Sequence, residues 1–214
     1  MNASRPETNK TIAALILAAG QGTRMGLVPK CLIHLDHQPI ILRQIDAFKL
    51  AGINDITIVT GFYHEQIETV LSVEPTLHIV RNIAPEQGQQ SSVRLGLARM
   101  RDDPDVVLIA LADQPLINEQ DLQELVCAYL CRPVSTEIMY PVVDGQRGNP
   151  VLMSAASVKE FLRNENEVTC RKYIDTHASH VYKYSTQNDH FVADLDTQDD
   201  LKTLAERTGL SVKF

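Results

Sequence analysis

The stretch from Ile12 to Lys30 constrains the fold of this chain more than any other. An unbroken apolar run, Ile12 to Ala19, leads directly into the glycine-rich segment Gly20 to Gly26. Such a run, ended by glycine, is typical of a strand that is buried on both faces and opens into a loop. Glycine lets successive backbone N–H groups converge on an anion, and Arg24 and Lys30 add positive charge. The stretch therefore predicts a phosphate-binding loop after a central strand.

The glycine spacing excludes two common nucleotide-binding loops. A Walker A loop needs a Gly-Lys pair five residues after its first glycine, where this chain has Met25 or Leu27. A dinucleotide fingerprint needs GxGxxG, but here Gly26 comes one residue late and Pro29 interrupts the segment behind it. The loop belongs to neither class.

Strand and helix patterns alternate along the rest of the chain. Apolar runs predict strands near 55–60, 77–81 and 105–112, and helical periodicity predicts helices at 40–50, 64–71 and up to about residue 100. This alternation predicts an α/β fold with a parallel sheet, right-handed crossovers and helices on both faces. Further along, we expect a helix from Asn118 to about 130, a β-hairpin around the turn 144–148, short strands at 181–184 and 190–192, and a final helix at 199–207.

Length and composition narrow the class of protein. The 214 residues predict one domain over 11–214 after a flexible, polar N-terminus at 1–10. A net charge of −7 without a block of Lys or Arg argues against a nucleic-acid partner. We find no bilayer-spanning apolar run and no signal peptide, so we expect no membrane association and a cytoplasmic location.

We predict no metal or disulfide site at the cysteines or at two closely spaced histidines. The four cysteines show no CxxC pairing and read as reduced thiols, with Cys127 and Cys131 expected on one core-facing side of a helix. His177 and His180 have a metal-like spacing, but no third ligand is in view, so we expect surface residues.

The segment 82–96 is a second candidate for contact with the ligand of the glycine loop. It follows a predicted parallel strand and therefore lies at the same edge of the sheet as Gly20. Its Gln and Ser side chains suit a base edge or ribose hydroxyls. An ordinary helix cap formed by Ser91 or Ser92 fits the spacing equally well.

Asp113 follows the strongest predicted strand of the chain. In Asp113-Gln114-Pro115 it could simply form a turn or cap a helix. The chemistry implied by a triphosphate loop, however, needs a hard oxygen ligand for Mg²⁺ near the α-phosphate. Asp113 is the candidate for that ligand.

These motifs resemble a known family. LAAGQGTRMG at 17–26, followed by Lys30, resembles the signature of sugar-nucleotide and cofactor nucleotidyltransferases, and ADQP at 112–115 narrows the resemblance to the molybdenum cofactor cytidylyltransferase-like group. DLDTQDDL at 194–201 resembles the ending of that family. The implied fold is a three-layer, Rossmann-like (GT-A-type) α/β domain with a mostly parallel central sheet and a small β-hairpin insertion.

The resemblance assigns roles to individual residues. Arg24 and Lys30 would be the catalytic cations, and Asp113 would bind Mg²⁺ together with Asp194 or Asp196, between which the sequence does not decide. The implied nucleotide-binding residues are Leu17, Ala18, Ala19, Gly20, Gly22, Thr23, Arg24, Lys30, Gly61, Gly88, Ser91, Ser92 and Asp113. The implied acceptor-binding residues are Gln114, Pro115, Gly148, Asn149, Pro150 and Arg171.

The activity implied by the resemblance is transfer of CMP from CTP to the phosphate of Mo-molybdopterin, with release of pyrophosphate. Ala19 favours cytidylyl transfer, because a Gly-Gly pair at that place accompanies the guanylyltransferases. Two departures affect the acceptor side: Asn149 stands where the family usually has histidine, and of the family segment around 167–171 only Arg171 survives.

Alternatives therefore stay open. GTP-dependent guanylyl transfer to molybdopterin, or transfer to a sugar or alcohol phosphate, would keep the nucleotide residues and change only the acceptor side. A non-catalytic nucleotide-binding protein or cofactor chaperone is the alternative from another class. A molybdoenzyme or its chaperone is the expected protein partner.

Overall fold

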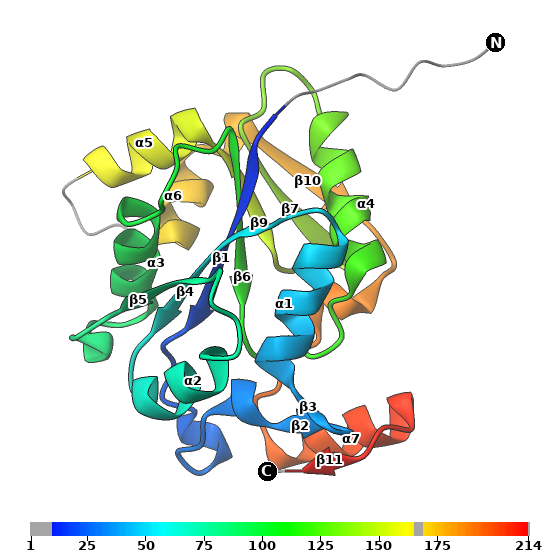
Figure 1. Ribbon diagram of the computed structural model, residues 1–214. Helices are drawn as coiled ribbons and strands as arrows, with labels where there is room; N and C mark the ends of the chain where they lie inside the picture. Colours follow the sequence, from blue (N-terminus) through cyan, green and yellow to red (C-terminus); the bar gives the residue numbers. More distant parts are fainter. Residues whose placement is uncertain (1–9, 165–168, 214) are drawn as a thin grey trace.

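The computed structural model describes residues 10–164 and 169–213 of the chain. The predicted flexible N-terminus falls, except for Lys10, outside the described residues, as do Glu167 and Val168 and the side chain of Arg24. Within the described part, eight strands form a main sheet and three form a small one (Figure 1).

The main sheet is mostly parallel, with the order β10-β7-β9-β6-β1-β4-β5 and β8 paired to β7. β1 lies at its centre, parallel to both β4 and β6, so the predicted central strand is confirmed. β9 runs antiparallel between β6 and β7, and β7 and β8 form the predicted hairpin. The strands are β1 (Ile12–Ala18), β4 (Asp55–Thr60), β5 (His78–Arg81), β6 (Val106–Leu111), β7 (Ile138–Val143), β8 (Gln146–Arg147), β9 (Val151–Ser154) and β10 (Val181–Ser185).

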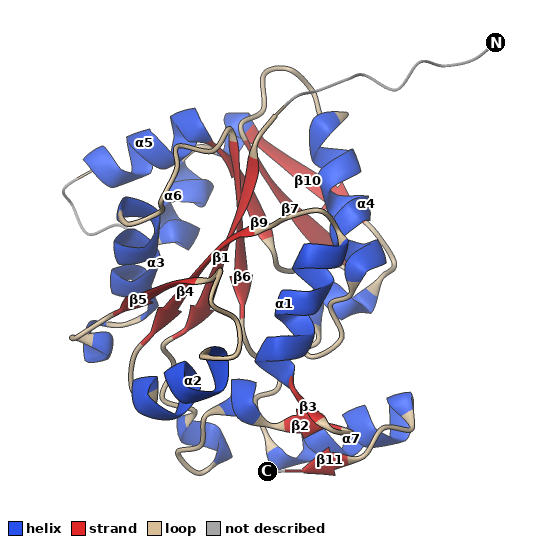
Figure 2. Cartoon of the chain, in the orientation of Figure 1, coloured by secondary structure: helices blue, strands red, loops and turns tan. Residues whose placement is uncertain are grey.

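Helices cover both faces of this sheet (Figure 2). One face packs on α1 (Ile40–Leu50), α2 (His64–Leu71) and α4 (Glu119–Leu130), and the other on α3 (Gln89–Ala98), α5 (Ala155–Arg163) and α6 (Cys170–Thr176). Successive residues of a strand face opposite sides, and in β1 Ile16 packs on the first face while Leu15 and Leu17 pack on the second. A central strand with two buried faces explains the unbroken apolar run in the sequence.

A small sheet lies beyond the carboxyl end of β1 (Figure 1). It consists of β2 (His34–Leu35), β3 (Gln38–Pro39) and β11 (Val212–Lys213), with α7 (Gln198–Thr208) packed nearby. Met25 and Ile33 from the segment after the glycines share a buried cluster with Leu195 and Leu201 from the C-terminal segment. The end of the chain therefore supports the glycine-rich loop, which is nearly two hundred residues earlier in the sequence.

The predicted elements agree closely with those of the structure, with a few corrections. Residues 190–192 lie in a 3-10 helix (Asp189–Val192), not a strand, and α5, α6 and β11 were not predicted. Cys127 and Cys131 are exposed on α4, so their predicted burial is wrong, because α4 turns its other side toward the sheet. All four cysteines are free thiols.

Candidate active site

A cleft of about 330 Å³ opens at the carboxyl ends of β1 and β6. This is where ligands bind in open α/β sheets, because the connecting loops diverge there. The walls come from the glycine-rich loop, the ends of both strands, and the loops before α2 and α3. The lining residues are Leu17, Ala18, Ala19, Gly20, Gln21, Gly22, Pro29, Lys30, Cys31, Phe62, Ile67, Pro85, Gly88, Gln89, Ser92, Leu111, Ala112 and Asp113.

Most of the predicted nucleotide residues line this cleft. Thr23, Gly61 and Ser91 do not. Gly61 instead allows a close approach, since a Cβ there would lie 2.8 Å from Ala19 Cβ. Ser91 turns back to donate its hydroxyl hydrogen to the Gly88 carbonyl at 2.8 Å. It lies inside α3, whose N-cap is Gly88, so neither Ser91 nor Ser92 caps that helix.

The glycine-rich loop is held in shape by its own backbone. Gly22 has φ +63°, and its carbonyl accepts hydrogen bonds from the N–H groups of Met25 at 3.0 Å and Leu27 at 3.2 Å. A Cβ at Gly22 would lie 2.3 Å from the Val28 carbonyl oxygen, so only glycine fits there. Nothing lies within 4 Å of the Cβ position of Gly20. The loop is therefore rigid at Gly22 and open toward the cleft at Gly20.

Lys30 connects the loop to the opposite carboxylates. Its Nζ lies 2.7 Å from Asp196 Oδ1 and 3.5 Å from Asp113 Oδ2, and its side chain is only 14% exposed. Asp113 is delivered by the end of β6, and its carbonyl accepts the N–H of Leu195 at 3.1 Å. This backbone bond brings the C-terminal segment against the cleft, next to the residue that follows the central strands.

The carboxylates of this group are crowded. Burial raises the pKa of Asp113 above its ordinary value, and the neighbouring Lys30 ammonium opposes that shift. The pKa of Asp194 is raised to about 6, first because the surrounding protein displaces water from it and then because of the Asp113 charge. A hydrogen bond from Gln114 lowers the pKa of Asp194 and so opposes part of this rise. Asp113, Asp194 and Asp196 thus place three carboxylates near the single ammonium of Lys30.

This surplus of negative charge suits a cation, although the metal site is not preformed. Among residues 10–164 and 169–213, no three His, Cys, Asp or Glu side chains are arranged to hold a metal ion. Carboxylate oxygens are nevertheless the hard donors that a divalent ion prefers, and the ion would offset their charge. Asp113, Asp194 and Asp196 are the residues that would hold it, with Lys30 at present between two of them.

The second wall of the cleft depends on Asn82, which the sequence analysis did not single out. The buried Asn82 amide donates to the hydroxyls of Ser91 and Ser92, both at 2.9 Å, and its oxygen accepts the N–H of Ala84 at 3.0 Å. Its position directly after β5 was the available signal. No sequence signal pointed to the apolar lining residues Phe62 and Pro85, because they lie outside the α-helices and strands, where hydrophobic periodicity gives no information.

The predicted acceptor residues lie beside the cleft, outside its lining. β9 pairs with β6, so Gly148 to Pro150 precede it next to the end of β6, and the Asn149–Pro150 peptide bond is cis. Gln114 is buried and donates its Nε2 hydrogen to the Phe191 carbonyl at 3.1 Å, and Pro115 is also buried. Arg171 is exposed on α6.

Similar proteins agree with this architecture. Over 116 residues, the chain is 37% identical to the bifunctional protein GlmU of Syntrophomonas wolfei, a match that covers 53% of this chain and 25% of GlmU. The chain thus matches only about a quarter of the length of that curated relative.

Among solved structures, Rv0371c of Mycobacterium tuberculosis aligns with a TM-score of 0.76 at 22% identity, over 93% of this chain and all of the other. A second structure of Rv0371c is a complex with manganese, with a TM-score of 0.71 at 21% identity, over 92% of this chain and 98% of the other. 4-Diphosphocytidyl-2C-methyl-D-erythritol synthase of Anaerococcus prevotii aligns with a TM-score of 0.70 at 16% identity, over 94% and 96% of the two chains. These likenesses establish the three-layer fold.

A family model identifies the chain more directly. The model of the MobA-like NTP transferase domain matches residues 14–181, which include most of β1, the glycine-rich loop, Lys30 and Asp113. The chain therefore belongs to the MobA-like NTP transferase domain family.

Proposed function

We propose that this protein is a divalent-metal-dependent nucleotidyltransferase that moves CMP from CTP to the phosphate of Mo-molybdopterin and releases pyrophosphate. The observation that carries the proposal is Lys30. It lies between Asp113 and Asp196 and lines the same cleft as Gly20 and Gly22 of the glycine-rich loop. A triphosphate in this cleft would meet both a cation and loop amides.

The reaction requires the protein mainly to position the two substrates and to neutralise charge. The acceptor phosphate is already an anion, so its attack on the α-phosphorus needs no protein base. The residues of the cleft orient the two phosphates in line, and Lys30 offsets charge on the transferring group. A Mg²⁺ ion, when bound by Asp113 with Asp194 or Asp196, would supply further neutralisation of the phosphate oxygens.

Different observations support CTP as the donor and Mo-molybdopterin as the acceptor. Ala19 lines the cleft, and the family resemblance links alanine there to cytidylyl transfer. The acceptor is favoured by the ADQP stretch at 112–115. All four cysteines are free thiols, which supports a location in a reducing compartment such as the cytoplasm. A molybdoenzyme or its chaperone would receive the product.

A second candidate is transfer to a sugar or alcohol phosphate. It is favoured by the identity to GlmU over half of the chain and by Asn149 in place of the family's histidine. The nucleotide side of the site would be unchanged.

Pyrophosphate release by the purified protein tests the proposal. We expect release with CTP and Mg²⁺ only when Mo-molybdopterin is present, and much less with GTP, ATP or UTP. Release with CTP and a sugar or alcohol phosphate instead would favour the second candidate. Nucleotide binding without release for any acceptor would contradict an enzymatic role.

Lys30 and Asp113 should be essential for turnover. Lys30→Ala and Asp113→Asn are each expected to lower kcat by about 10²–10³-fold, because the first removes positive charge that stabilises the transition state and the second removes a carboxylate that would hold the metal ion. Asp113→Asn should fold, since the burial that raises the pKa of Asp113 makes its charge costly to the folded state. Circular dichroism checks the fold, and steady-state pyrophosphate release measures kcat.

Matched controls come from an exposed ion pair on α7. Lys202 and Asp199 lie 2.8 Å apart at the surface, away from the cleft. Lys202→Ala and Asp199→Asn should leave kcat within about twofold of wild type, as expected for exposed pairs. A wild-type rate in the Lys30 or Asp113 variant would remove that residue from the site.

Asp194 should make stability depend on pH. Its pKa of about 6 in the folded state exceeds the ordinary 3.8, so the folded state binds its proton more tightly and loses stability as pH rises from about 4 to 6. Without metal, Asp194→Asn should therefore raise the free energy of unfolding above pH 6 and change it little below pH 4. Urea unfolding at pH 4 and pH 7.5 measures this, and an equal effect at both values would contradict the crowding of the carboxylates.

A further inference from the structure

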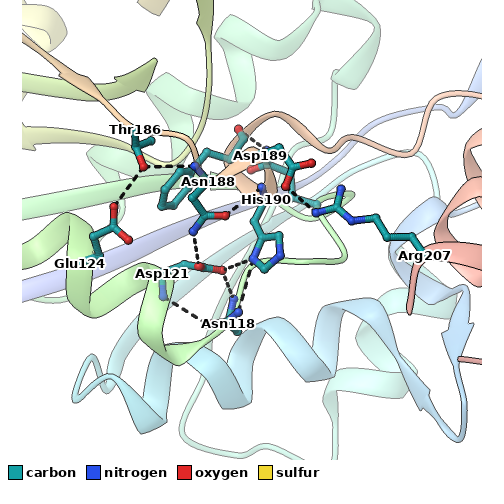
Figure 3. A network of polar contacts seen from close by, with 10 residues as sticks. Asn118, Asp121, Glu124, Thr186, Asn188, Asp189, His190 and Arg207 are labelled. Atoms are coloured by element: carbon teal, nitrogen blue, oxygen red, sulfur yellow. Dashed lines mark hydrogen bonds and ion pairs between the residues drawn. The ribbon is translucent and has the colours of Figure 1, made fainter. Parts of the chain in front are cut away.

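A polar network joins the start of α4 to the segment Thr186–Val192 (Figure 3). At its centre is Asp121, whose side chain is only 5% exposed. Its Oδ1 accepts a hydrogen bond from Asn188 Nδ2 at 2.6 Å, and its Oδ2 lies 2.9 Å from His190 Nδ1. An ionised carboxylate only accepts, so in this contact the shared proton would lie on His190 Nδ1.

Capping of α4 does not account for this arrangement. Asn118 and Asp121 already form a complete capping box, with Asn118 N–H to Asp121 Oδ2 at 2.9 Å and Asp121 N–H to Asn118 Oδ1 at 3.1 Å. The bonds from Asn188 and His190 are additional and come from a segment about seventy residues later. Two donors from one short segment on one buried carboxylate fix that segment relative to α4.

The anchored segment contacts the acceptor side of the candidate site. The carbonyl of the fully buried Phe191 accepts hydrogen bonds from Gln114 Nε2 at 3.1 Å and from the Asn149 N–H at 2.9 Å. A Cβ on Gly148 would lie 2.5 Å from the same oxygen, so the packing is close. Phe191 thus holds the residues next to the end of β6.

The same segment leads directly to the acidic residues of the cleft. Three residues after Phe191 comes Asp194, whose N–H donates to the Val192 carbonyl at 3.2 Å, and then Leu195, bonded to the Asp113 carbonyl. Asp196 follows and pairs with Lys30. With so short a connection, the place of Asp194 and Asp196 depends on where Phe191 is held.

We propose that Asp121 is a positioning residue that, through Asn188 and His190, sets the place of Phe191 and so of Asp194, Asn149 and Gln114. This inference rests on the proposed function, since it assigns Asp121 to the metal and acceptor side of that site. The nucleotide side, formed by the glycine-rich loop and the end of β1, is outside its reach.

Two variants test this from opposite sides of the contact. Asp121→Asn keeps the shape of the side chain but removes the charge, and Asn188→Ala leaves the capping box of α4 intact. Glu119→Gln is the matched control: Glu119 lies with Asp121 in the first turn of α4, accepts from Gln123 at 2.9 Å, and contacts neither Asn188 nor His190 in any described interaction. All three positions lie outside the lining of the cleft.

Two readouts separate positioning from general stability. Hydrogen exchange of the Asn149 and Leu195 amides reports the anchored segment without reference to activity. We expect about tenfold faster exchange of these two amides in both variants, with amides of β1 and β6 unchanged. In turnover, we expect kcat to fall about tenfold, while the dissociation constant for CTP measured without Mg²⁺ stays within twofold of wild type.

The outcomes distinguish this inference from the proposed function. Wild-type exchange and wild-type kcat in both variants would overturn the positioning role. Equal losses in CTP affinity, kcat and thermal stability, matched by Glu119→Gln, would also overturn it and show a merely structural role. If the wild-type protein released no pyrophosphate with any acceptor, the proposed function would fail, whereas the exchange experiment would still test whether Asp121 places the segment.

Discussion

The balance of charge around Lys30 is the constraint on which the candidate site depends. Acidic residues arrive there from two distant parts of the chain, Asp113 from the end of β6 and Asp196 from the segment before α7. Burial of these carboxylates, and then the approach of their like charges, raises the pKa values of Asp113 and Asp194, and this shift is a cost to the folded state. Such a cost is typical of a functional site rather than of a fold optimised for stability.

The rest of the architecture supplies this charge cluster with a rigid frame. The fully buried central strand β1 places the glycine-rich loop beside the end of β6. The small sheet and its core tie that loop to the C-terminal segment through Met25 and Leu195. The loop, Lys30 and the late acidic residues therefore form one supported unit, although the sequence separates them widely.

Much of this frame could be predicted from the sequence because local signals and global fold agree. The apolar run of β1, the helical periodicity of α1 and α2, and the start of α4 at Asn118 each have a local physical cause, and each was predicted with accurate bounds. The family resemblance supplied Asp113 as a cleft residue, and the structure places it there.

What the sequence could not supply depends on contacts between distant segments. α6 is a short helix with a polar sequence, and β11 pairs for only two residues, so neither has a pattern of its own. The prediction that Cys127 and Cys131 are buried was wrong, because a small residue can lie on either the buried or the exposed side of a helix. The salt bridge between Lys30 and Asp196, and the second use of Asp121 by Asn188 and His190, appear only once the chain is folded.

Calorimetric titration of CTP into the wild-type protein, with and without Mg²⁺, tests the central claim most directly. The account predicts binding of one CTP per chain that is strengthened at least tenfold by the ion, and it predicts that Asp113→Asn abolishes this strengthening while CTP still binds weakly to the glycine-rich loop. CTP affinity that is the same with and without Mg²⁺, or the same ion dependence in Asp113→Asn, would contradict the account.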